Sequence, residues 1–184
     1  MPRFAKIFLV GYTGCGKTTL GRSAAKRLRV GFADTDSVIE SEERASVADI
    51  FRYEGEEHFR YAERAVAERL SSEDGDMIIS TGGGLPVWRD NAEFLKSSGT
   101  SVYIRRSAER IAARLTPYGR AKRPRLRGLS DDELIAFMER DIAAREPFYA
   151  NAHYTLDGDS CSDKELVEKI VTIFDNIKKS SSEQ

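Results

Sequence analysis

The chain is short of cysteine, tryptophan and long apolar segments. Its 184 residues include two cysteines and one tryptophan. No apolar run approaches the roughly 18 residues that a membrane span needs, and no signal peptide is recognisable, so we expect a protein that stays where it is made. Cys15 and Cys161 lack the spacing of a metal site, and a disulfide at Cys15 would obstruct the glycine-rich loop around it. We therefore expect a reducing, cytoplasmic environment.

Net charge is nearly absent as well. Lysine and arginine number 29 against 30 aspartate and glutamate residues, which gives a formal charge of −1. This balance exerts no overall attraction on nucleic acid or on an anionic membrane, so we expect neither as a partner. A chain of this length has room for one core. We expect a single domain over residues 1–179 and a polar, disordered tail over residues 180–184.

What the chain does contain is a phosphate-binding loop. Residues 11–18 read G-Y-T-G-C-G-K-T, between an apolar strand-like segment at 6–10 and a helix-like segment at 19–28. In that context the glycines let backbone N–H groups surround an anion, Lys17 reaches the β- and γ-phosphates, and the Thr18 hydroxyl can hold Mg²⁺. The sequence therefore predicts binding of a nucleoside triphosphate. The expected contacts are Gly14, Cys15, Gly16, Lys17, Thr18 and Thr19.

Strand-like and helix-like segments alternate along the rest of the chain. Further strands are expected at 31–34, 77–80, 101–104 and 153–156, and helices at 56–70, 88–96 and 107–115. Ser-x-x-Glu capping boxes at Ser130 and Ser162 open two more helices. Such alternation predicts an α/β fold, a parallel sheet with helices on both faces. Ligands of such sheets lie beyond the carboxyl ends of the strands, so these ends become candidate site positions.

Two of these strand ends carry unusual residues. Asp34 and Asp36 lie two apart after the second strand, and in extended geometry both would face the same side. One could lie near Mg²⁺ while the other accepts a proton from a hydroxyl nucleophile. Alternatively, Asp36 only caps the following helix. Gly82, Gly83 and Gly84 follow the third strand, as a flexible turn or as backbone that approaches a ligand closely.

In order along the chain, these motifs resemble the shikimate kinase family. They are the phosphate loop, Asp34-x-Asp36 with Ile39-Glu40, Ile50-Phe51…Gly55-Glu56…Phe59-Arg60…Glu63, Thr81-Gly82-Gly83-Gly84, Arg123-Pro124, and Arg145-x-Pro-x-Tyr149. The resemblance implies a P-loop, nucleoside-monophosphate-kinase-like fold with a five-stranded parallel sheet in the order 2-3-1-4-5. It also implies MgATP-dependent phosphorylation of the 3-hydroxyl of shikimate, on the route to chorismate and the aromatic amino acids.

The resemblance also implies roles for individual residues. Arg60 and Arg145 match the arginines that bind the acceptor carboxylate, a task suited to their planar, two-pronged donors. Asp36 matches the carboxylate that bonds the acceptor hydroxyls and could take the proton, and Asp34 the one near the metal. Gly82, Gly83 and Gly84 match backbone against the acceptor ring. Without the family, Arg60 would read as a solvated helix residue and Arg145 as a cation stabilising a helix C-terminus.

Residues 116–128 match the family's lid. Five cations lie there, and Arg123 matches the arginine that reaches the phosphates, so the catalytic set is Lys17, Asp36 and Arg123. Such a loop should be mobile without ligands. Arg125 stands where the family usually has leucine. The bland alternative is a solvated basic loop or a nucleic-acid patch. Arg114 matches an arginine beside adenine, whereas the segment after Leu156 shows no clear match for an adenine-contacting loop.

Two other functions are compatible with the phosphate loop. One is another small-molecule kinase of the same fold, such as a gluconate kinase, which the triple glycine and the Phe59-Arg60 pair disfavour. The other is a catalytically silent nucleotide-dependent regulator. This is disfavoured by the joint presence of six residues: Lys17, Thr18, Asp36, Arg60, Arg123 and Arg145. We expect shikimate as the substrate and a monomeric protein.

Overall fold

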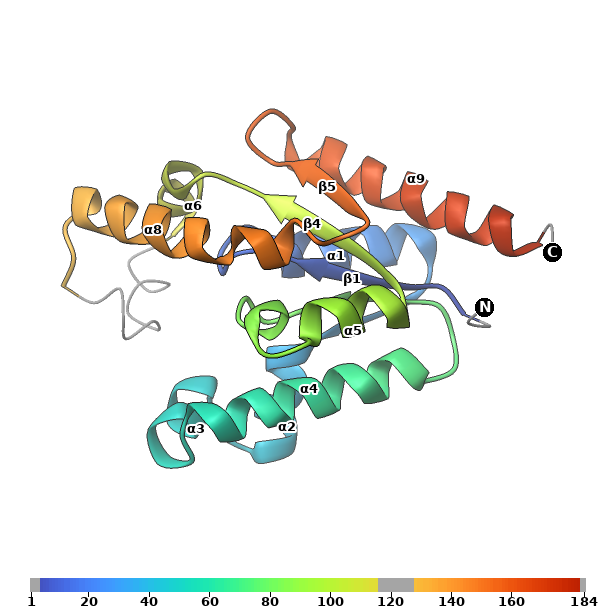
Figure 1. The fold of residues 1–184 in the computed structure, drawn as a ribbon. Helices are drawn as coiled ribbons and strands as arrows, with labels where there is room; N and C mark the ends of the chain where they lie inside the picture. Colours follow the sequence, from blue (N-terminus) through green and yellow to red (C-terminus); the bar gives the residue numbers. More distant parts are fainter. Residues whose placement is uncertain (1–3, 116–127, 183–184) are drawn as a thin grey trace.

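The computed structural model describes residues 4–115 and 128–182, and of residues 181 and 182 only the backbone. In this part of the chain, five strands form one parallel sheet in the order β2-β3-β1-β4-β5 (Figure 1). They are β1 (Lys6–Val10), β2 (Gly31–Asp34), β3 (Met77–Ser80), β4 (Thr100–Arg105) and β5 (Tyr154–Asp157). The predicted α/β class and strand order are confirmed.

Helices connect consecutive strands and cover both faces of the sheet (Figure 1). They are α1 (Lys17–Leu28), α2 (Thr35–Glu43), α3 (Val47–Tyr53), α4 (Glu56–Ser72), the 3-10 helix η1 (Leu85–Val87), α5 (Asn91–Ser98), α6 (Ala108–Arg114), α8 (Asp131–Tyr149) and α9 (Asp163–Ser182). Helices α1 and α9 pack together on one face, and α4, α5 and α8 lie on the other.

The centre of the sheet is the core of the molecule. Phe8 and Leu9 on β1 and Val102 and Ile104 on β4 are fully buried. A strand that is covered on both faces is apolar at successive positions rather than at alternate ones, which is why these segments read as short apolar runs. The edge strand β2 is only half-buried.

Helix starts follow the capping residues that the sequence indicates. Ser130 and Glu133 exchange backbone and side-chain hydrogen bonds at the start of α8, and Ser162 and Glu165 do the same before α9. Each exchange satisfies N–H groups that have no partner inside the helix. Both predicted capping boxes are confirmed.

Two local predictions were wrong. The helix expected at residues 88–96 is divided: Pro86 lies in the 3-10 turn η1, Arg89 takes a left-handed conformation with φ 51°, and α5 begins only at Asn91. The tail expected to be disordered from Ser180 belongs to α9 as far as Ser182, and the Ser180 hydroxyl donates to the carbonyl of Asn176. Residues 183 and 184 lie outside the described part.

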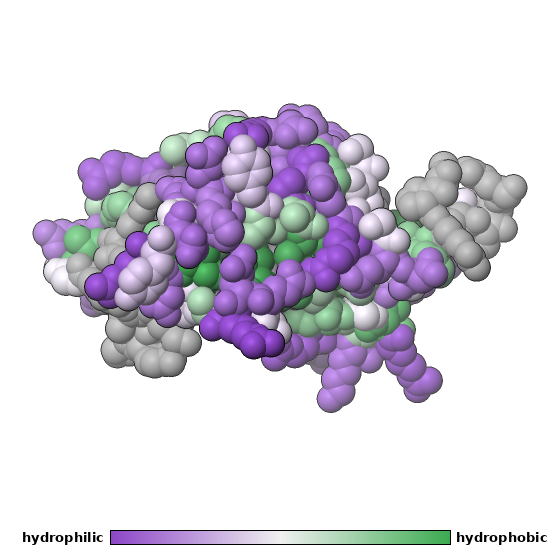
Figure 2. All heavy atoms as spheres, turned by 90° about the horizontal axis from the view of Figure 1, so that it is seen from below, coloured by the Kyte–Doolittle hydropathy of each residue, from purple (hydrophilic) through white to green (hydrophobic). Residues whose placement is uncertain are grey.

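Hydrophilic side chains cover most of the face seen in Figure 2, and hydrophobic ones show between them near its middle. Four large hydrophobic residues of the described chain are exposed: Tyr53, Tyr61, Phe148 and Tyr154. No described helix is both long enough and apolar enough to cross a membrane.

Candidate active site

The phosphate loop joins the end of β1 to the start of α1. Gly14 and Gly16 have φ values of 85° and 104°, which side-chain-bearing residues rarely adopt, so glycine is required at both. Lys17 is only 6 % exposed and extends back along the loop. Its Nζ donates to the carbonyls of Gly11 and Tyr12 at 2.7 and 3.0 Å. The ammonium group is thus held beside the loop, where phosphate oxygens could replace the two carbonyls as its hydrogen-bond acceptors.

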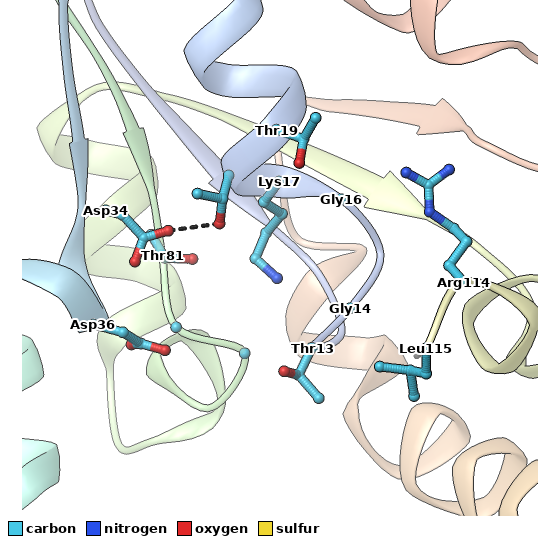
Figure 3. Close-up of a pocket in the computed structure, with 13 residues that line it drawn as sticks. Thr13, Gly14, Gly16, Lys17, Thr19, Asp34, Asp36, Thr81, Arg114 and Leu115 are labelled. Carbon is cyan, nitrogen blue, oxygen red and sulfur yellow. Dashed lines mark hydrogen bonds between the residues drawn. The ribbon is translucent and has the colours of Figure 1, made fainter. Parts of the chain in front are cut away.

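A cavity of about 420 Å³ opens at the carboxyl ends of the strands beside this loop. Asp34 and Asp36 stand on one side of it, Arg114 and Leu115 stand on the other, and Lys17 extends between them (Figure 3). The remaining lining residues are Thr13, Gly14, Gly16, Thr18, Thr19, Thr81, Gly82 and Gly83. Three strand ends therefore converge on one cavity, as the parallel sheet predicts.

Cys15 does not line this cavity, although the sequence placed it among the triphosphate contacts. Its side chain is fully buried, and its N–H donates to the Tyr12 carbonyl at 3.2 Å. This bond closes a turn of the loop, and the contact of Cys15 with a triphosphate stays a prediction. Cys15 and Cys161 are both free thiols.

The end of β2 carries the first of the two aspartates. Asp34 caps α2, since its Oδ1 accepts from the N–H of Ser37 at 3.3 Å, and its Oδ2 accepts from the Thr18 hydroxyl at 2.7 Å. A hydroxyl and a carboxylate beside a phosphate loop are the oxygen ligands that Mg²⁺ prefers. No described part of the chain gathers three or more His, Cys, Asp or Glu into a metal cluster.

Asp36 lines the cavity from an element that the sequence did not predict for it. It lies in the first turn of α2 rather than in a strand, so the extended geometry assumed for the pair was wrong, and the cap is Asp34 rather than Asp36. Asp36 Oδ1 is buried without a hydrogen-bond partner. Burial first, and then the neighbouring Asp34 carboxylate, raise the pKa of Asp36 to about 6. A carboxylate of this kind can accept a proton near neutral pH.

Arg60 on α4 is enclosed by acidic side chains. Its guanidinium donates to Glu63, whose side chain is fully buried, and to Glu56 at 3.0 Å. It also lies 5.6 Å from the ring centres of Phe51 and Phe59. Burial raises the pKa of Glu63 to about 7, against the opposing effect of Arg60. These contacts fix the orientation of the guanidinium group.

The glycines after β3 leave room for these charged groups. A Cβ at Gly82 would overlap Glu63 Oε1 and Asp36 Oδ1, and a Cβ at Gly84 would overlap the guanidinium of Arg60. The Gly82 N–H donates to the Thr35 hydroxyl at 2.9 Å. The triple glycine is therefore a close approach of backbone to buried charge and more than a flexible turn.

Arg145 lies near the end of α8, on the other side of the glycine segment. Its Nε donates to Asp141 at 3.0 Å, and its guanidinium lies 5.6 Å from the Tyr12 ring centre. One turn further on, the Tyr149 hydroxyl donates to the Gly83 carbonyl at 2.6 Å. Arg60, Gly84 and Arg145 do not line the 420 Å³ cavity themselves, but adjoin its walls at Gly83 and the phosphate loop.

A second cavity of about 440 Å³ adjoins Arg114. Arg114 lines both cavities and binds Asp163 through Nη1 and Nη2 at 3.2 and 2.9 Å. Arg106, Arg110, Ala113 and residues 158–163 complete the walls. The segment after Leu156, which matched no adenine-contacting pattern in the sequence, is thus placed beside Arg114 by the fold.

Sequence reasoning assigned no role to several residues of the site. Glu63 lies three residues after Arg60, and Asp141 lies four before Arg145, so helical spacing of opposite charges was an available signal for both. Tyr12 gave no signal, because its partner is 129 residues away. Arg123 and the rest of residues 116–127 of the expected lid lie outside the described residues.

Comparison with known proteins agrees with this geometry. A family model described as shikimate kinase matches residues 13–175. A shikimate kinase from Parabacteroides distasonis is 44 % identical over 84 % of this chain and 88 % of its own length.

Solved structures give the same result. A shikimate kinase from Bacteroides thetaiotaomicron has a TM-score of 0.83 and 36 % identity, over 95 % of this chain and 98 % of the other. One from Acinetobacter baumannii, solved in complex with shikimate, has a TM-score of 0.82 and 34 % identity over 96 % of each chain. A gluconokinase from Sinorhizobium meliloti, 16 % identical with a TM-score of 0.53 over 98 % of this chain and 99 % of its own, shares the fold alone. The chain belongs to the shikimate kinase family.

Proposed function

We propose that the protein transfers the γ-phosphoryl group of ATP to the 3-hydroxyl of shikimate, with the side chains named above in distinct roles. The observation that carries this proposal is the position of Asp36. Asp36, whose carboxyl group has one buried oxygen without a partner, lines the same cavity as Lys17 of the phosphate loop. That arrangement suits a hydroxyl that gives up its proton as it attacks a phosphoryl group.

The reaction requires little covalent chemistry from the protein. Lys17 leaves the loop carbonyls to bind the β- and γ-phosphates, and the loop N–H groups bind the same anion. Asp36 orients the attacking hydroxyl and takes its proton. Because the pKa of Asp36 is raised to about 6, the group is both ionised at neutral pH and more basic than an exposed aspartate.

Shikimate also carries a carboxylate, and Arg60 and Arg145 are the groups to bind it. Both guanidinium groups are pre-oriented by their acidic neighbours, Glu63 and Asp141. Pre-orientation reduces the entropy lost on binding and fixes which hydroxyl faces the phosphate. The backbone of Gly82, Gly83 and Gly84 would lie against the ring.

Thr18 and Asp34 would hold Mg²⁺, Asp34 through water. When bound, the ion neutralises phosphate charge that develops during transfer. Arg114 and the cavity lined by residues 158–163 would hold the adenine of ATP. Arg123 completes the proposed catalytic set from the sequence alone, as a cation on the transferred phosphate.

A coupled assay of ADP release separates this function from its two alternatives. Purified protein is given MgATP with shikimate, with gluconate or with no acceptor. We expect release with shikimate alone. Release with gluconate would indicate a different small-molecule kinase, and equal rates with and without acceptor would contradict kinase activity toward either. Mg²⁺ dependence is checked in the same assay with EDTA.

We further propose that the enzyme acts as a monomer in the cytoplasm. Sedimentation velocity at micromolar concentration should give a single species close to 20.6 kDa, the mass of one chain. A species of twice that mass would contradict the monomer. Fractionation of the source cells tests the compartment.

A further inference from the structure

Three side chains form a chain of contacts between the phosphate loop and helix α8. The Tyr12 hydroxyl donates to Asp141 Oδ2 at 2.8 Å, and Asp141 Oδ1 accepts from Arg145 Nε at 3.0 Å. Tyr12 is 4 % exposed, and the carboxylate of Asp141 is 23 % exposed. One carboxylate therefore has one oxygen on the nucleotide side of the site and the other on the acceptor side.

The contact between Asp141 and Arg145 leaves the arginine suited to its proposed task. Asp141 takes the Nε–H, and the guanidinium also interacts with the Tyr149 hydroxyl. The two terminal nitrogens carry the N–H groups that can grip a carboxylate with two parallel hydrogen bonds. The ion pair with Asp141 also favours this rotamer of Arg145 over others.

The contact between Tyr12 and Asp141 ties that arrangement to the loop. Tyr12 has its carbonyl bonded to Lys17 Nζ and to the Cys15 N–H. Phosphates that draw Lys17 away remove one of these bonds and fix the loop backbone through its N–H groups instead. A change at the Tyr12 backbone reaches the Asp141 carboxylate through a single buried ring, which lies 5.6 Å from the Arg145 guanidinium.

We propose that Asp141 is a positioning residue for Arg145, and that the Tyr12–Asp141 hydrogen bond couples nucleotide binding to acceptor binding. Each ligand then binds more tightly when the other is present, because the first to bind orders side chains that the second also needs. The effect must be reciprocal. This inference rests on the proposed role of Arg145 in binding the shikimate carboxylate.

The coupling is tested by calorimetric titration with shikimate, with and without saturating MgADP. In the unmodified protein, we expect MgADP to tighten shikimate binding by about threefold to tenfold. In Tyr12→Phe, which keeps the ring and loses the hydroxyl, shikimate should bind as before without nucleotide, and the gain from MgADP should disappear. An unmodified protein without any gain, or a Tyr12→Phe variant that keeps it, overturns the coupling.

Tyr103→Phe is the matched control. Tyr103 is also buried and also donates its hydroxyl to a carboxylate of α8, Glu146, at 2.6 Å, but it comes from β4 and not from the phosphate loop. Loss of the Tyr103 hydroxyl should lower thermal stability about as much as loss of the Tyr12 hydroxyl. It should leave the tightening of shikimate binding by MgADP intact. Equal loss of the gain in both variants would mean that α8 is merely loosened, which overturns the specific link.

The positioning role is tested by steady-state kinetics. Asp141→Ala should raise the shikimate KM about tenfold with kcat within twofold, and Asp141→Asn, which can still accept from Nε, should recover most of that loss. Arg145→Lys is measured in parallel. If Arg145→Lys raises the KM and Asp141→Ala does not, the positioning role fails while the proposed acceptor site stands. If neither raises it, Arg145 does not bind the acceptor and both proposals fail.

Discussion

The two halves of the cavity are built in different ways. The phosphate-binding part of the nucleotide half is one continuous segment, residues 11–18, whose backbone N–H groups and glycine conformations come from local sequence. The acceptor half takes single side chains from α2, α4 and α8, and the two arginines among them lie against a counter-charge, Arg60 on Glu63 and Arg145 on Asp141. A site of the first kind is predictable from a motif, whereas one of the second kind depends on tertiary packing.

Both halves contain buried polar atoms without a hydrogen-bond partner, and in the acceptor half these atoms belong to carboxyl groups. Asp36 and Glu63 both have raised pKa values, mainly through burial, and each has a buried oxygen without a hydrogen-bond partner. Buried charge without a partner is costly. In the nucleotide half, the buried Lys17 has its bonds satisfied by loop carbonyls, whereas Arg106, which lines the second cavity, has Nε and Nη1 buried without a partner. Substitutions in the acceptor half should therefore change kcat or the shikimate KM, and substitutions in the nucleotide half should change the ATP KM.

The largest effect is expected from Asp36→Asn. The amide keeps the shape of the side chain and cannot take a proton, so kcat should fall by roughly 10²–10⁴ with both KM values near normal. The start of α2 should be unaffected, because Asp34 provides the cap. Glu40→Gln, one turn further along α2, is the control and should leave kcat within twofold. A near-normal kcat in Asp36→Asn, with a normal melting curve, would contradict the proposal that Asp36 is the general base.

The next largest effect is expected from Arg60→Lys. Lysine keeps the charge but loses the planar fork, and it leaves the fully buried Glu63 with a poorer partner. Loss of such a charged contact costs about 2–4 kcal/mol, or roughly 30-fold to 1,000-fold in the shikimate KM. The ATP KM should be unchanged.

Arg64→Lys, one turn along the same helix, is the control. Arg64 pairs with Glu68 and bonds Asn91 away from the cavity, so the shikimate KM should stay within twofold. An unchanged KM in Arg60→Lys, or an equal rise in both variants, would contradict the acceptor site on α4.

The features that the sequence predicted are those that depend on a local motif, and the features that it missed are those that depend on tertiary packing. The α/β class, the phosphate loop and the glycine turn were predictable, because apolar runs, fixed spacing and glycine positions are local properties, whereas the strand order came only from the resemblance to the shikimate kinase family. The position of Asp36 was not: the spacing suggested a strand, and only the packing of α2 shows that Asp34 ends the strand and caps the helix. The break between η1 and α5 depends on the left-handed Arg89, which its side chain gives no reason to expect.

A smaller effect is expected in the pH dependence of stability. The pKa of Asp36 is about 6 in the folded protein and about 3.9 in an unfolded chain, so between pH 4 and 6 the folded state binds more protons. The free energy of unfolding then falls as pH rises through this window, by roughly 1–3 kcal/mol from this group. Asp36→Asn removes the penalty.

Melting curves without nucleotide or metal check this. The Tm of Asp36→Asn relative to the unmodified protein should increase from pH 4 to pH 7. Lys17, Arg60, Glu63, Glu40 and Asp34 face this carboxylate and are common to both proteins. A difference in Tm that stays constant over this range, or decreases, would show that burial does not hold the proton on Asp36.

The smallest effect is expected at the far end of the nucleotide half, from Arg114→Ala. Arg114 is 38 % exposed and paired with a similarly exposed Asp163, so its contacts are screened by water and contribute at most about 1 kcal/mol. We expect the ATP KM to rise about twofold to tenfold and the shikimate KM to stay within twofold.

Arg105→Ala is the matched control, because Arg105 pairs with Asp157 at similar exposure but lines neither cavity. It should leave both KM values unchanged. If Arg114→Ala raises the shikimate KM instead, the two halves of the cavity are not divided as the structure indicates. If Arg105→Ala raises the ATP KM equally, the effect belongs to surface charge in general and not to a nucleotide pocket beside Arg114.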